Sequence, residues 1–170
     1  ITKNISKNSK GAIAMYEEIP IEELVKFQPK ELKEHTISDA DYTDHACSYI
    51  CRLSGGFIVF GGWLKVFVGD FLGDGIEREA YCAMGGLGIS VYSDTGTFTC
   101  SNGGCPEGKW WTPEYVYNNT ASVMAYAASE ANPEGEIIFF DKHSHIIASV
   151  KPNTSRAPFL GGGTVNWEKA

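Results

Sequence analysis

The stretch from Gly55 to Cys100 constrains the fold of this 170-residue chain more than any other. Apolar segments of strand length alternate there with short breaks. The breaks are glycine pairs and the turn-like pieces GDG and SDTG, at residues 55–56, 61–62, 73–75, 85–86 and 93–96. This pattern predicts a tightly bent antiparallel sheet. We expect the rest of the chain to lead into that sheet or to complete it.

Composition limits the class of protein. The length fits one domain, and 43% hydrophobic with 12% aromatic residues indicates a globular chain. The net charge of −7 repels phosphate backbones, which argues against a nucleic-acid partner. No apolar run approaches the roughly 20 residues that cross a bilayer as a helix, so no transmembrane segment is predicted. We expect a monomer.

The chain divides into three predicted parts: a flexible arm at 1–16, a helical cap at 17–54, and a β-barrel at 55–170. Within the cap, Ser38 and Asp41 have the spacing of a capping box. Apolar residues then recur at helical spacing until Gly55. They are Tyr42, Ala46, Tyr49, Ile50 and Leu53. The sequence therefore predicts an N-terminal helical segment that lies across one end of the sheet.

Strands account for most of the remainder, and the predicted class is all-β. In the bent sheet they are expected at 57–60, 63–68, 76–84, 87–93 and 97–100. Further strands are expected at 121–129, 136–140, 146–150 and 161–167. Residues 63–68 alternate, with Leu64, Val66 and Val68 on one face. The segment GGLGISVY at 85–92 recurs as LGGGTVNW at 160–167, which indicates two related four-stranded halves.

Three segments carry a family resemblance: IIFFDKHSHIIASV at 137–150, FLGGGTVNW at 159–167 and GGLGISVYSDTGTF at 85–98. They resemble the virulence-associated proteins, the VapA and VapB group of secreted actinobacterial proteins. The resemblance implies a compact eight-stranded antiparallel barrel with a side-chain-filled interior. It also implies a role linked to survival in host phagosomes and to endolysosomal membranes, with no catalytic constellation and no cofactor. The segment 17–54, the cysteines and a tryptophan loop depart from the family pattern.

Cysteines and sequons predict passage through a secretory pathway. Five cysteines leave one unpaired. Cys100 and Cys105 bracket a short loop that a disulfide could close, and Cys82 is expected to pair with either Cys51 or Cys47. Acceptor sequons for N-glycosylation occur at three positions. They begin at Asn4, Asn118 and Asn153.

Residues 101–114 form a long segment with no strand or helix pattern. It carries Lys109, Trp110 and Trp111. One interpretation is a binding lip, in which the aromatic faces meet a sugar ring, a lipid or a partner surface. The alternative is a loop folded over the barrel end, with the tryptophans closing the core.

Two clusters could carry chemistry. Asp141, His143 and His145 would share one side of a continuous strand and suit a transition metal. The five polar residues between Phe140 and Ile146 favour a hairpin turn instead, which separates these groups. A second cluster is the set of carboxylates Asp70, Asp74, Glu77 and Glu79, which could serve as acid and base in glycoside hydrolysis.

The sequence therefore predicts a secreted, non-enzymatic, effector-like or surface-interacting barrel that binds a host or membrane component. One alternative is a secreted polysaccharide or cell-wall hydrolase that uses the carboxylates and the tryptophan loop. The other is a carrier of a small apolar ligand, since eight strands can just enclose one.

Overall fold

The computed structural model describes residues 38–127, 134–154 and 159–170. Strands dominate these ranges, and the one α-helix among them is short. The elements are η1 (Asp39–Asp41), β1 (Tyr42–Thr43), β2 (Ser48–Val68), β3 (Arg78–Cys100), β4 (Trp110–Trp111), α4 (Pro113–Asn119), β5 (Thr120–Ala127), β6 (Glu136–Asp141), β7 (Ile146–Pro152), β8 (Phe159–Thr164) and β9 (Asn166–Lys169).

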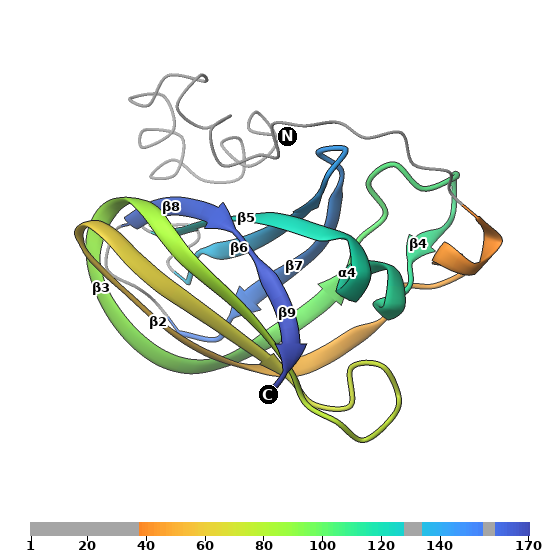
Figure 1. The fold of residues 1–170 in the computed structure, drawn as a ribbon, viewed down its shortest axis with the longest axis horizontal. Helices are drawn as coiled ribbons and strands as arrows, with labels where there is room; N and C mark the ends of the chain where they lie inside the picture. Colours follow the sequence, from red (N-terminus) through yellow and green to blue (C-terminus); the bar gives the residue numbers. More distant parts are fainter. Residues whose placement is uncertain (1–37, 128–133, 155–158) are drawn as a thin grey trace.

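Seven antiparallel strands form a closed barrel (Figure 1). Six of them follow the order β2-β3-β7-β6-β5-β8, and β8 pairs back onto β3 and closes the ring. The seventh strand, β9, pairs with β3, while β1 and β4 form a separate two-stranded sheet. The predicted antiparallel barrel is confirmed, with seven strands in place of the expected eight.

The strand count differs because the bent sheet is built from two long strands rather than five short ones. β2 and β3 pair over nearly their whole length, with one irregularity between Val59 and Gly61. The SDTG piece is not a turn: Gly96 pairs with Cys51, and Ser93 pairs with Ser54, inside the ladder. Both strands curl together round the left end of the molecule in Figure 1. The turn predicted at 73–75 is confirmed, since it lies in the connection between β2 and β3.

The helix predicted from Ser38 is wrong beyond its first turn. The capping box between Ser38 and Asp41 is present, but it opens only the 3-10 turn η1. From Ser48 the chain is strand, because β3 offers a continuous partner for its backbone. Tyr49, Cys51 and Leu53 then fall on one face of the strand. Tyr49 and Leu53 also have the spacing of one helical face, which is why the sequence predicted a helix here. The part of the predicted cap before residue 38 lies outside the described residues.

Side chains fill the barrel interior. The predicted alternation at 63–68 holds, since Leu64, Val66 and Val68 are buried. The rings of Phe98, Phe139 and Trp167 contact one another there, with Phe98 5.7 Å from each of the other two and these two 5.9 Å apart, measured between centroids. Each buried aromatic ring removes a large apolar area from water, which stabilises the closed barrel.

The glycines of β8 let two strands approach closely. A Cβ atom at Gly161 would lie 2.2 Å from the ring of Phe57 and 2.7 Å from the carbonyl oxygen of Gly85. Opposite Gly161, Gly86 has φ of 151°, and a Cβ there would lie 2.2 Å from the carbonyl oxygen of Leu160. Any side chain at these positions would push β3 and β8 apart. The glycine-rich segments therefore close the barrel.

Candidate functional site

The tryptophan loop folds over the end of the barrel that carries α4, at the right of Figure 1. Trp111 is fully buried, and its indole nitrogen donates to the carbonyl oxygen of Gly103 at 2.7 Å. Trp110 is half-buried and pairs with Thr43 in the small sheet. The ammonium of Lys109 forms an ion pair with Asp44. Trp111 thus closes the core, and only Trp110 and Lys109 of the predicted binding residues reach solvent.

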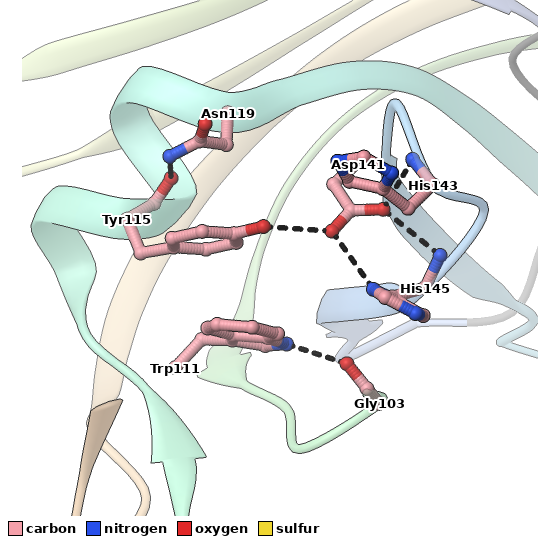
Figure 2. A network of polar contacts seen from close by, with 7 residues as sticks. All are labelled: Gly103, Trp111, Tyr115, Asn119, Asp141, His143 and His145. Carbon is pink, nitrogen blue, oxygen red and sulfur yellow. Dashed lines mark hydrogen bonds and ion pairs between the residues drawn. The ribbon is translucent and has the colours of Figure 1, made fainter. Parts of the chain in front are cut away.

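The short helix α4 sets the position of Tyr115. Thr112 caps the helix by accepting the backbone N–H of Tyr115 at 3.1 Å, and Pro113 occupies the first turn. The ring of Tyr115 then stacks on that of Trp111, with centroids 3.9 Å apart and planes 12° apart. This stack directs the phenol of Tyr115 into the barrel end (Figure 2).

Asp141, the last residue of β6, receives that phenol. Its carboxylate is 1% exposed and accepts the Tyr115 hydroxyl at 2.8 Å. It also accepts the backbone N–H groups of His143 and His145, each at 2.9 Å. The Nδ1 atom of His145 lies 3.1 Å from the same carboxylate. We call Asp141, Tyr115, Trp111, His143 and His145 the Asp141 cluster (Figure 2).

The Asp141 cluster has the properties of a structural support. A buried carboxylate with several donors is stabilised, whereas an unpaired one would be costly. Burial, and then the hydrogen bond to Asp141, raise the pKa of the Tyr115 phenol above its usual value. The turn predicted between Phe140 and Ile146 is confirmed as the connection between β6 and β7. The separation expected of it is wrong, because His143 and His145 both bond to the Asp141 carboxylate. Within the described ranges, no three His, Cys, Asp or Glu side chains gather as metal ligands would.

The carboxylates considered for hydrolysis are each engaged elsewhere. Asp70 accepts the backbone N–H of Gly75, and Asp74 pairs with Arg78 at 2.7 Å. Glu77 pairs with Arg52 at 2.9 Å, and Glu79 with Lys65 at 3.8 Å. The Arg78 guanidinium holds the pKa of Asp74 below its usual range. The lowered pKa keeps Asp74 ionised, whereas a general acid needs a raised pKa.

The cysteines and sequons are placed as follows. All five cysteines are thiols in the structure. Cys51 lies opposite Gly96, whereas Cys82 lies opposite Leu64 at the other end of β2. Asn118 is exposed on α4. Asn153 is also exposed, and its amide donates to the hydroxyl of Thr95 at 2.8 Å. Asn4 lies outside the described residues.

A second region stands out where β2 and β3 bend, at the left of Figure 1. Large apolar side chains face solvent there, with Ile58 80%, Phe60 74% and Val91 81% exposed. We call this group the apolar bend. It consists of Ile58, Val59, Phe60, Trp63, Leu87 and Val91. Exposed apolar patches of this kind mark interaction surfaces.

The apolar bend has no charges of its own. Residues 53–64 and 80–93 contain no Asp, Glu, Lys, Arg or His. The nearest charged side chains along the strands are Arg52, Lys65, Glu79 and Asp94. The bend forms part of the outer wall of the barrel.

Backbone strain coincides with the apolar bend. Val59 has φ of 62°, which is unfavourable for a β-branched residue. It sits at the irregularity in the β2–β3 ladder, where Val59 pairs with Gly88 but Gly61 pairs with Gly85. A bulge bends a strand and can redirect its side chains. Strain of this kind persists where the surrounding structure imposes it, and it is common at functional sites.

Sequence reasoning missed two groups of residues. Tyr115 was not singled out, because its partner Asp141 lies 26 positions away. The strands predicted at 57–60, 63–68 and 87–93 hold the residues of the bend, but the exposure of their side chains was not predicted. A signal for the bend was nevertheless present: the absence of charge over 53–64 and 80–93.

The fold defines a class, the closed antiparallel β-barrel. Two solved structures from the intracellular pathogen Rhodococcus equi are similar to this chain in fold. The virulence-associated protein VapB is 16% identical, with a TM-score of 0.57 over 74% of this chain and 100% of that one. VapD is 23% identical, with a TM-score of 0.54 over 72% and 98%. The predicted resemblance is confirmed at the level of fold.

Comparison by sequence adds no relative, since no family model and no curated protein matches the chain. Among the described residues, no helix has the length and apolar character of a membrane span.

Proposed function

We propose that the protein is a secreted, non-enzymatic barrel that binds a lipid membrane surface through the apolar bend. The observation that carries this proposal is an uncharged, exposed apolar surface that includes Phe60 and Trp63. Lipid acyl chains require neither hydrogen bonds nor charges from the side chains that enter them. Aromatic residues are favoured at the boundary between headgroups and acyl chains.

The rest of the molecule is consistent with binding from outside the bilayer. The interior positions of the barrel are occupied by buried side chains such as Phe57, Phe98 and Phe139, which leaves the outer wall as the binding surface. The likeness in fold to the virulence-associated proteins of Rhodococcus equi supports an effector-like role on a host membrane.

Co-sedimentation with phosphatidylcholine vesicles at pH 7 and pH 5 tests this proposal. We expect association at both pH values and little sensitivity to salt, because the apolar bend is uncharged. Phe60→Asp should weaken binding at least tenfold, since burial of a Phe side chain contributes about 1.5 to 3 kcal/mol. Ile50→Asp is the matched control, because Ile50 is 83% exposed on β2 but lies outside the bend.

The lipid headgroup charge provides a second readout. The net charge of −7 at pH 7 and the isoelectric point near 5.1 predict repulsion from anionic lipid at pH 7. Addition of phosphatidylserine should therefore weaken association at pH 7 and have little effect at pH 5. A complete lack of association with phosphatidylcholine at either pH, or equal weakening by Phe60→Asp and Ile50→Asp, would overturn the proposal.

A further inference from the structure

The residue before β2 and the last residue of β3 are both cysteines. One more pair beyond Ser48 and Thr99 in the β2–β3 ladder places Cys47 opposite Cys100. The backbone N–H of Cys100 donates to the carbonyl oxygen of Cys47 at 2.9 Å. This is a bond of a hydrogen-bonded antiparallel pair, whose two side chains lie on the same face of the sheet.

The dimensions of such a pair suit a disulfide. The two Cα atoms of a hydrogen-bonded pair are about 5.5 Å apart, within the range of about 4.4 to 6.8 Å found for bridged cysteines. Their Cβ atoms must approach by about 1 Å, from about 5 Å to about 4 Å. Cys47 precedes the first residue of β2 and can make this shift without loss of a strand pair.

The other cysteines have different neighbours. Cys51 lies opposite Gly96, and Cys82 lies opposite Leu64. Cys105 lies in the loop that follows β3. The ladder and the bond from the Cys100 N–H to the Cys47 carbonyl therefore make Cys47 the thiol that faces Cys100, although only four residues lie between Cys100 and Cys105 along the chain.

We propose that Cys47 and Cys100 form a disulfide that fixes the open end of the β2–β3 hairpin. The oxidant is a small-molecule disulfide. The Cys47 thiolate attacks one sulfur of this molecule and displaces its first thiolate, which yields a mixed disulfide. The Cys100 thiolate then attacks the Cys47 sulfur, which forms the protein disulfide and releases the second thiolate. Two protein thiols are oxidised and one disulfide is reduced to two thiols.

The order of these steps follows from exposure. Cys47 is half-buried and reaches the oxidant, while Cys100 is fully buried and meets only its neighbour. Burial raises the pKa of both thiols, so the reaction is slow at neutral pH and faster at alkaline pH.

Mass spectrometry tests the proposal. Reduced protein is first incubated with glutathione disulfide at mildly alkaline pH, and the remaining free thiols are then alkylated. We expect wild-type protein to lose two hydrogen atoms in mass and to protect two cysteines from alkylation. Digestion without reductant should release one peptide pair that joins Cys47 to Cys100. The unfolding midpoint should rise by about 10 °C on oxidation, because the bridge closes a loop of some fifty residues.

Three variants make the assignment specific. Cys47→Ser should abolish the protected pair, and Cys47→Ala should do the same if Ser disturbs folding. Cys105→Ser should keep it, since Cys105 is half-buried like Cys47 but faces Asp141. Near-ultraviolet circular dichroism confirms that each variant is folded. A bond that survives in Cys47→Ser, a bond lost in Cys105→Ser, or folded wild type that gains no bond would each overturn the proposal.

Discussion

One end of the barrel buries a charged group, whereas the other end exposes apolar side chains. At the end with α4, the Asp141 carboxylate is 1% exposed and surrounded by hydrogen-bond donors. At the other end, Phe60 is 74% exposed and has no charged residue near it along the strand. A buried carboxylate and an exposed Phe are both unusual in a small domain.

This difference assigns stability to the end with α4 and binding to the end with the apolar bend. Every described contact of Asp141 orders the turn between β6 and β7 or anchors α4, so the cluster contributes to the fold. The apolar bend adds little to the core, because its side chains point outward. Phe60 lies in the irregularity of the β2–β3 ladder, so a polar residue there would leave the flanking strand pairs at Val59 and Gly61 in place. We therefore expect substitutions at the two ends to affect different measurements.

The largest effect on stability should come from Asp141→Ala. The change leaves the Tyr115 hydroxyl and two backbone N–H groups buried without an acceptor, at a cost of about 3 kcal/mol or more. Chemical denaturation followed by tryptophan fluorescence measures it. Asp141→Asn retains one acceptor oxygen and should cost less. A loss below about 1 kcal/mol for the Ala variant would show that water replaces the carboxylate.

The second-largest effect should appear in vesicle binding and not in stability. Trp63→Ser in the apolar bend is expected to weaken vesicle association several-fold, while the free energy of unfolding changes by less than about 1 kcal/mol. Trp63 is 38% exposed, and this exposed area contacts the membrane in the proposed mode of binding. Comparable losses of stability and binding in this variant would remove the distinction between the two ends.

Tyr115→Phe should have an intermediate effect on stability, a loss of about 1 kcal/mol at neutral pH, because one hydrogen bond to Asp141 is removed. The aromatic ring at position 115 still stacks on Trp111 in this variant. Vesicle binding should not change. If binding falls while stability holds, the α4 end also takes part in recognition.

The same variant should alter the response to alkali. The raised pKa of Tyr115 means that the folded state keeps its proton above pH 10, where the unfolded state loses it. The contribution is fully present below pH 10 and falls as the pH rises further. The slope is about 1.4 kcal/mol per pH unit for this proton. Denaturation series at pH 9 and pH 11 should show a shallower decline in Tyr115→Phe than in wild type.

The smallest effect should come from Val59→Gly. Glycine relieves the strain at φ of 62° but loses more chain entropy on folding, for a net gain of about 0.5 kcal/mol. A loss of stability instead would mean that the Val59 side chain packs usefully at the bend. The denaturation midpoint provides the readout.

The sequence predicted much of the fold because strand alternation is a local property. Leu64, Val66 and Val68 repeat with period two, and the buried face follows from that repeat. The helix from Ser38 failed because Tyr49 and Leu53 satisfy both periods, and only pairing with β3 decides between them. The SDTG segment failed for the same reason, since its residues pair with β2 in the ladder.

Neither candidate region could be predicted fully. The contact of Tyr115 with Asp141 depends on how α4 meets the end of β6, which is a property of the closed barrel. The exposure of Phe60 depends on a bulge that no local signal marks. The turn at Asp141, by contrast, was predictable, because polar residues separate two apolar runs.

The pairing of β3 has a consequence for how the protein is made. One edge of β3 meets β7, β8 and β9, all from the second half of the chain, and β9 ends at Lys169. During synthesis, the β2–β3 hairpin must wait with this edge unpaired until the last strands leave the ribosome. Open edges of this kind invite aggregation. The nascent chain therefore completes its barrel only after β9 has left the ribosome, and this edge of β3 stays open until then.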